Sequence, residues 1–111
     1  MQIEELFKEV INELKNLNIP IQYVNNQLNV SPPHILFNYL TYDSYYSNDH
    51  VESCVVCVTL NLIFNTIEYE KTKFFLKEIK KAGYHQVARW QYENESRTYV
   101  IAFDKEFIVK E

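Results

Sequence analysis

The two cysteines of the chain, Cys54 and Cys57, form a C-x-x-C motif inside the stretch SCVVCVTLNLIF. This spacing is typical of redox centres and of zinc sites. A redox pair usually lies at the start of a helix, where the thiol pKa is lowered. The stretch from Val51 to Phe64 instead alternates between a wholly apolar set and a mixed set of residues, which is typical of a long, half-buried strand.

On a strand, residues three apart point to opposite faces of the sheet. We therefore predict that Cys54 faces the core and that Cys57 faces the other side, so that the two thiols neither pair nor share a metal ion. The motif is interpreted as a strand that carries two small apolar residues. A cysteine nucleophile is not expected either, because it needs an exposed thiolate with a base beside it.

The other residues that could carry chemistry are scattered. His34, His50 and His85 have no partner at metal-ligand spacing, and one glycine cannot build a glycine-rich phosphate loop. The carboxylates are placed on predicted helix faces and in turns, as Glu4 and Glu5 are, rather than as an acid–base pair. We predict that the protein is not an enzyme and that it holds no cofactor and no metal.

Hydrophobic periodicity predicts one α+β domain over residues 1–111, in which two helices pack on a mostly antiparallel sheet of four to five strands. The predicted order is α-β-β-β-α-β-β. The helices are expected at residues 2–17 and 65–83, and the strands at residues 19–24, 34–42, 51–64, 84–93 and 97–110. Within the second helix, the residues expected to be buried are Thr72, Phe75, Leu76 and Ile79.

Composition excludes several classes of protein. The net charge of −4 argues against a general nucleic-acid binder, which needs a basic face to release counterions from phosphates. The opening MQIEELFKEV is acidic and amphipathic, so we do not expect it to be a secretory signal, and no apolar run approaches the roughly 20 residues of a membrane helix. We expect a soluble cytoplasmic protein with reduced thiols and no membrane contact.

The most unusual feature is a concentration of aromatic and polar residues at 43–50, DSYYSNDH, which is predicted to be a loop that projects from the sheet. Tyrosine is favoured at protein interfaces, although these side chains could equally pack back onto their own sheet. The mixed face of the long strand is also too apolar for a solvent-exposed surface, and two helices can cover only one face. The predicted interface residues are Tyr42, Tyr45, Tyr46, Asn48, His50, Val55, Cys57 and Thr59.

The order of these segments resembles the small tail-terminator, or tail-completion, proteins of long-tailed bacteriophages, which include head–tail joining and minor capsid proteins. The resemblance covers nearly the whole chain and is one of pattern rather than of a catalytic signature. It lies in the segments IEELFKEVINELKNL, IPIQYV, PPHILFNYLTY, SYYSNDH, NLIFNT, IEYEKTKFFLKEIKKAG and RWQYENESRTYVIAFDKEFIV.

The resemblance implies a structural virion protein that assembles with itself into a ring, commonly a hexamer. The ring would cap the completed tail tube and join it to the head, in contact with the tail tube protein and a head-completion or stopper protein. It would be assembled in the host cytoplasm and end at the head–tail joint of the virion. DNA would pass through the channel without specific binding, and a net negative charge on every copy favours sliding.

A second hypothesis comes from a different class of protein. A small cytoplasmic protein-binding module or regulator, acting as a monomer or dimer, would explain the same apolar sheet face. The order of the oligomer separates the two hypotheses, because a ring requires a head-to-tail contact that closes on itself.

Overall fold

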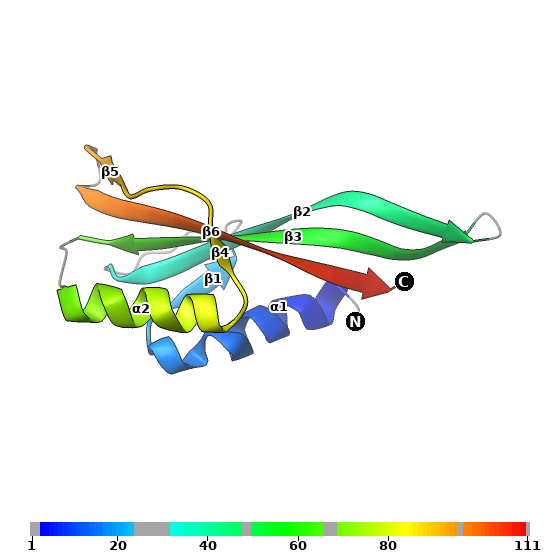
Figure 1. The fold of residues 1–111 in the computed structure, drawn as a ribbon, viewed down its shortest axis with the longest axis horizontal. Helices are drawn as coiled ribbons and strands as arrows, with labels where there is room; N and C mark the ends of the chain where they lie inside the picture. The colour runs from blue at the N-terminus through cyan, green and yellow to red at the C-terminus, as the bar shows by residue number, and fades with distance from the viewer. Residues whose placement is uncertain (1–2, 24–31, 48–49, 66–68, 96, 111) are drawn as a thin grey trace.

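The computed structural model describes residues 3–23, 32–47, 50–65, 69–95 and 97–110 of the 111-residue chain, with the backbone only at residues 3, 42–47, 50–53, 69 and 110. Two α-helices lie on one face of a six-stranded sheet (Figure 1). The strand order is β1-β2-β3-β6-β4, and β5 also pairs with β6. The predicted α+β class is confirmed, with a sheet of six strands rather than four to five.

The first helix is shorter than predicted and is followed by a tight turn of 3₁₀ helix. Helix α1 spans Ile3–Glu13 and the 3₁₀ helix η1 spans Lys15–Leu17. Asn18 ends the segment in the left-handed conformation, with φ of 55°, as expected for a residue that stops a helix. Ile11, although it follows the apolar periodicity of the helix, lies at the margin of the buried stripe and is 45% exposed. The buried positions are Leu6, Val10, Leu14 and Leu17.

An aromatic cluster holds α1 against the first two strands. Strand β1 (Ile21–Tyr23) pairs in parallel with β2 (His34–Ser47). A cis peptide bond between Pro32 and Pro33 precedes β2 in the chain. The ring of Phe7 on α1 lies 5.0 Å from that of Tyr23 and 5.5 Å from that of Tyr39, measured between centroids. These ring contacts hold α1 against the face of the sheet formed by β1 and β2.

Strands β2 and β3 (His50–Phe64) form one long antiparallel hairpin. Pairing continues from His34 opposite Ile63 to Ser47 opposite His50, with two register shifts. The prediction of a loop at 43–50 is therefore wrong for residues 43–47 and 50. Tyrosine favours strands, and in the hairpin the backbone N–H and C=O groups of this segment find ladder partners, which outweighs the turn-like Asp and Ser composition.

Helix α2 spans Tyr69–Lys81 and lies on the same face of the sheet as α1 (Figure 1). Its predicted stripe is confirmed, since Thr72, Phe75 and Ile79 are buried and Leu76 packs against the core. Gly83, the one glycine, follows the helix at φ of +99°, a conformation that suits glycine because it has no Cβ.

The strand predicted at 84–93 is two short strands, so this prediction is corrected. Strand β4 (His85–Gln86) and strand β5 (Gln91–Glu93) both pair with β6 (Thr98–Lys110). Between them, the Gln86 Nε2 amide donates a hydrogen bond to the carbonyl of Ala88, and Trp90 packs edge-on against Phe64. These local contacts draw the chain away from the sheet edge after Val87.

The core lies between the helices and alternate residues of β3 and β6. The β3 residues that face the helices are Val56, Val58, Leu60, Leu62 and Phe64. Toward the tip of the β2–β3 hairpin, β2, β3 and the end of β6 form a part of the sheet called here the ribbon, whose core side is still buried at Phe107 and Val109 and whose other face carries no helix. Past Ser53, which lies opposite Lys110, the hairpin continues without β6 (Figure 1). The molecule is therefore 52 Å long, and its radius of gyration of 15.4 Å exceeds the roughly 13 Å of a compact domain of this length.

Truncation of Phe103 tests this assignment of the core. Phe103 is completely buried, whereas Phe74 on α2 is 45% exposed. We expect Phe103→Ala to lower the free energy of unfolding by about 3–5 kcal/mol, because the side chain leaves a cavity. The matched control Phe74→Ala should change it by less than about 1 kcal/mol. Equal losses in urea denaturation would show that this face of β6 is not buried.

Candidate functional site

The face of the sheet opposite the helices, called here the outer face, carries the residues that the hydrophobic core does not use. In the antiparallel register, Leu40 of β2 lies opposite Cys57 of β3, and Cys57 lies opposite Glu106 of β6. Directly opposite residues point to the same side of a sheet, so these three form one row across the ribbon. Thr59 and Asp104 form the next row toward the helix-covered body.

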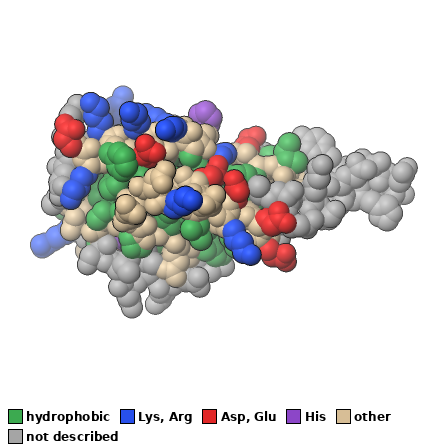
Figure 2. Space-filling view, turned by 90° about the horizontal axis from the view of Figure 1, so that it is seen from below, with side chains coloured by type: hydrophobic (Ala, Val, Ile, Leu, Met, Phe, Trp, Pro, Cys, Tyr) green, Lys and Arg blue, Asp and Glu red, His purple; other side chains and the backbone are tan. Residues whose placement is uncertain are grey.

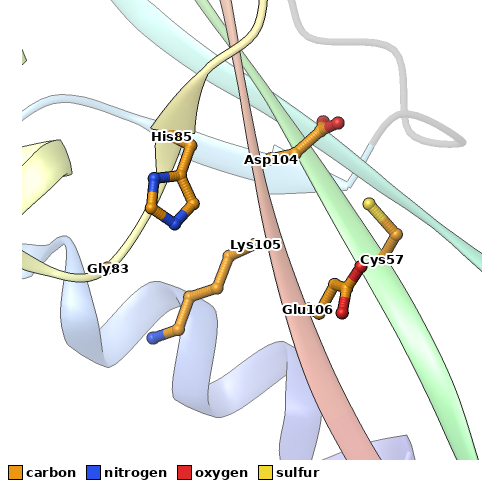
Figure 3. Close-up of a pocket in the computed structure, with 6 residues that line it drawn as sticks. All are labelled: Cys57, Gly83, His85, Asp104, Lys105 and Glu106. Atoms are coloured by element: carbon orange, nitrogen blue, oxygen red, sulfur yellow. The ribbon is translucent and has the colours of Figure 1, made fainter.

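A cleft of about 500 Å³ opens where β4 ends against β6 (Figure 3). Strand β4 pairs with β6 only at His85 opposite Asp104 and Gln86 opposite Phe103. The cleft therefore lies beside the part of β6 that continues past β4. It is lined by Cys57, Gly83, His85, Asp104, Lys105 and Glu106.

The acidic side of the cleft determines the state of the Cys57 thiol. Burial raises the pKa of Cys57, and the nearby carboxylates of Asp104 and Glu106 raise it further, because both effects disfavour a thiolate. A hydrogen bond with Thr59 acts in the opposite direction. The Thr59 hydroxyl also donates to Asp104 Oδ1 over 2.9 Å. The thiol is therefore held in its protonated form, which opposes its use as a nucleophile.

On the other side of the cleft, Lys105 makes a structural contact that joins both helices to β6. Lys105 points away from Asp104 and Glu106 toward the helix layer (Figure 3). Its Nζ donates hydrogen bonds to the carboxylate of Glu13 at the end of α1 and, over 2.7 Å, to the carbonyl of Ala82 after α2. A cation near the last carbonyls of a helix is also favoured by the helix dipole.

Tyr84 contacts both Glu13 and Lys105. Its side chain is 1% exposed, and its hydroxyl donates to Glu13 Oε1 over 3.3 Å. Burial, followed by the negative charge of Glu13, raises the pKa of Tyr84 well above its usual range. Lys105 Nζ also lies 5.2 Å from the centre of the Tyr84 ring. A side chain at Gly83 would begin 3.3 Å from Lys105 Cε, so the small residue leaves room for the lysine.

The two cysteines of the C-x-x-C motif lie in different surroundings. Within the described ranges, no group of three or more His, Cys, Asp or Glu residues is placed to hold a metal ion. Cys54 and Cys57 form no disulfide, and their predicted placement on opposite faces is confirmed. Cys54 packs against the core, whereas Cys57 lines the cleft. What the cleft presents is a protonated thiol between two carboxylates.

The ribbon also exposes large apolar side chains, which sequence reasoning missed. Leu40 of β2 is 67% exposed and Ile108 of β6 is 62% exposed. Ile108 lies opposite Val55 of β3, so both apolar residues belong to the outer face. The signal was present in the sequence, because Asp104, Glu106 and Ile108 are alternate residues, and two charged neighbours mark the face that the core does not use.

The predicted interface residues fall into two groups. Thr59 and Cys57 share the outer face and are half-buried, and Val55 on the same face is 9% exposed. Tyr42, Tyr45 and Tyr46 belong to β2, and His50 begins β3, but their side chains lie outside what the structure describes. Asn48 lies outside the described residues altogether. The structure brings together the β3 group and adds Leu40, Asp104, Glu106 and Ile108 to it.

Comparison of the sequence with protein-family models and with curated proteins gives no match. None of the described helices has the length and apolar character that crossing a membrane requires. Seen from the helix side, the body carries charged groups of both signs with hydrophobic side chains between them (Figure 2). The evidence for a function is therefore the geometry of the outer face and of the ribbon.

Alkylation of the Cys57 thiol tests the electrostatics of the cleft. In a Cys54→Ser background, we expect Cys57 to react with iodoacetamide near pH 8 several-fold more slowly than in the urea-unfolded chain, because its raised pKa leaves less thiolate. Asp104→Asn with Glu106→Gln should speed the reaction, since both carboxylates disfavour the thiolate. A rate unchanged by these substitutions would contradict the proposed cause.

Stability at high pH tests the environment of Tyr84. Because the pKa of this phenol is raised in the folded protein, its contribution to stability is complete below about pH 10, the usual tyrosine pKa, and is lost as the pH rises further. We expect the urea midpoint to fall more steeply between about pH 9 and pH 11 in the unmodified protein than in Tyr84→Phe. Parallel curves for the two proteins would show that Tyr84 ionises normally.

Proposed function

We propose that this chain is a structural subunit that assembles with other copies through the outer face of its ribbon, in the manner of a phage tail-terminator protein. The observation that carries the proposal is Leu40, an apolar residue of β2 that is 67% exposed and lies opposite Cys57 on the outer face, the face on which neither helix lies (Figure 1). Large apolar side chains exposed together on a sheet mark an interaction surface.

The shape of the molecule supports assembly rather than capture of a small ligand. The ribbon has two edges along which no strand of the described residues pairs, namely β2 past Phe37 and β6 past Asp104. Exposed strand edges invite pairing with another chain. A head-to-tail contact that uses different surfaces on neighbouring copies closes into a ring when the rotation permits.

In this proposal the ring, commonly a hexamer in the resembling proteins, caps the tail tube and joins it to the head. Its partners are the tail tube protein and a head-completion or stopper protein, and DNA passes through its channel without specific binding. The chain's net charge of −4 is compatible with passage of DNA, because a negatively charged wall repels phosphates. The subunit needs no catalytic residue and no cofactor for this role.

Substitution of Leu40 tests the assembly surface. We expect Leu40→Lys to abolish assembly while leaving the fold intact, because an exposed position tolerates the change within about 0.5 kcal/mol. Light scattering across a concentration series, with negative-stain imaging of the heaviest fraction, measures the outcome with and without purified tail tubes. Phe74→Lys, on the exposed face of α2, is the matched control.

The same experiment separates the ring from the protein-binding module. Rings with a central hole that depend on Leu40 would support the proposal. A monomer or dimer that forms no ring even with tail tubes present would overturn the tail-terminator role and leave the protein-binding module. Rings that are insensitive to Leu40→Lys would show that another surface makes the contact.

A further inference from the structure

The last residues of β6 form a strand edge that complements itself. From Glu106 to Lys110 the sequence reads EFIVK, with opposite charges at its two ends and Ile108 at its centre. An antiparallel second copy beside this strand would present the same segment in reverse order. The negative charge of one copy would then lie opposite the positive charge of the other. We propose that two copies of this chain pair their β6 edges antiparallel about a two-fold axis at Ile108.

The backbone of this edge is oriented for such pairing. The N–H of Val87 donates to the carbonyl of Ala102 over 3.0 Å, so the backbone groups of Ala102 point away from β3. In an antiparallel strand, successive residues direct their N–H and C=O groups to alternate sides. Glu106 and Ile108 therefore direct theirs to the same edge as Ala102, beyond the end of β4 at His85 opposite Asp104.

The proposed register satisfies both the backbone and the side chains. With Ile108 opposite Ile108 of the second copy, the residues that meet across the axis all direct their backbone groups to the shared edge. Glu106 then lies opposite Lys110 of the second copy, and this pair occurs twice because the contact is isologous. Two isoleucines in contact also cover the side chain that is 62% exposed in one copy.

Other registers are excluded by what already occupies the sheet. Sliding the second copy two residues toward β4 would bring its residue 110 against Asp104, where His85 already pairs. Sliding it two residues the other way would put Lys110 opposite Ile108 and remove the opposite-charge pairs. A shift of one residue would place backbone N–H and C=O groups that point to the free edge opposite residues of the second copy whose own groups point to β3 and are already paired. The two-fold at Ile108 is therefore the register with the most favourable pairs.

The pairing would also extend the hydrophobic core across two copies. Phe107 and Val109 point to the helix side, where each is already largely buried. In the proposed register, Phe107 lies opposite Val109 of the second copy, so apolar residues continue across the axis on that face. The contact uses β6 and leaves Leu40 on β2 exposed, so it does not rest on the proposed ring.

A charge-exchange cycle tests the contact and its register. The variants are Glu106→Lys, Lys110→Glu and the double exchange, and sedimentation equilibrium gives the dimer dissociation constant of each. Either single exchange places like charges opposite each other twice and should weaken dimerisation by about tenfold or more. The double exchange restores opposite charges and should return the constant to within about threefold of the original. Glu70→Lys, an exposed change on α2, is the matched control and should have no effect.

The outcomes decide the proposal in either direction. An unmodified chain that is a monomer at every concentration would overturn it, as would a double exchange no better than either single exchange. Assembly that responds to Leu40→Lys but to neither single charge exchange would also overturn it, while leaving the proposed ring in place. Conversely, a dimer that follows the charge cycle and ignores Leu40→Lys would support the β6 contact even if no ring forms.

Crosslinking provides an independent measurement of the axis. In a Cys54→Ser, Cys57→Ser background, Ile108→Cys places one thiol of each copy beside the two-fold. A short bis-maleimide should then give a covalent dimer at concentrations where the same reaction with Phe74→Cys gives none. Equal crosslinking of the two variants would indicate random collision and would count against the contact.

Discussion

The pairing of β3 with β6, from Ser53 opposite Lys110 to Phe64 opposite Tyr99, is the constraint on which the rest of the structure depends. It sets which alternate residues of both strands face the helices, and a slip by one residue would exchange the two faces. The helices cover only one face of this ladder, and past Ser53 the β2–β3 hairpin continues without β6 (Figure 1). The same pairing therefore sets both the buried core face and the outer face that the helices leave uncovered.

The contact of Lys105 shows how the body is held to this ladder. Lys105 belongs to β6, and its Nζ meets Glu13 of α1 and the carbonyl of Ala82 after α2. It also lies 4.8 Å from the centre of the Phe107 ring, where a cation is attracted to the aromatic face. A partly buried charge with several partners fixes the positions of those partners more than it adds to stability. The next residue toward the ribbon, Glu106, belongs to the outer face, so the helix contact and the cleft share one strand.

The ribbon is where the molecule departs from the way soluble proteins usually protect a sheet. Native edges are commonly shortened, covered or given charges that prevent pairing. The end of β6 does carry charges, and in the proposed contact their order would place opposite charges against each other. The exposed Leu40 lies on the opposite edge strand, so the ribbon offers two distinct surfaces. A head-to-tail contact through the outer face around Leu40 is compatible with a two-fold contact at the β6 edge, whereas a head-to-tail contact through the β6 edge itself is not.

Periodicity predicted the elements that bury a continuous face. The stripe of α2 and the opposite faces of Cys54 and Cys57 follow from local spacing, and the structure confirms both. Local spacing also predicted that two helices cover only one face. The interface residues on the β3 strand followed from its mixed alternate positions. Leu40 and Ile108 were missed because the pairing of β2 and β6 with β3 places them on the face that the helices leave uncovered.

By itself, the sequence determined the α+β class, the faces of β3 and the buried stripes of the helices, because each depends on neighbours within a few residues. Only the tertiary structure decided that residues 43–47 continue a strand, that residues 84–93 break into two, and that a cleft forms beside Asp104 and Glu106. These features depend on which distant segment supplies the next backbone partner. Strand pairing joins residues far apart in the chain, and no local pattern specifies its length or its end.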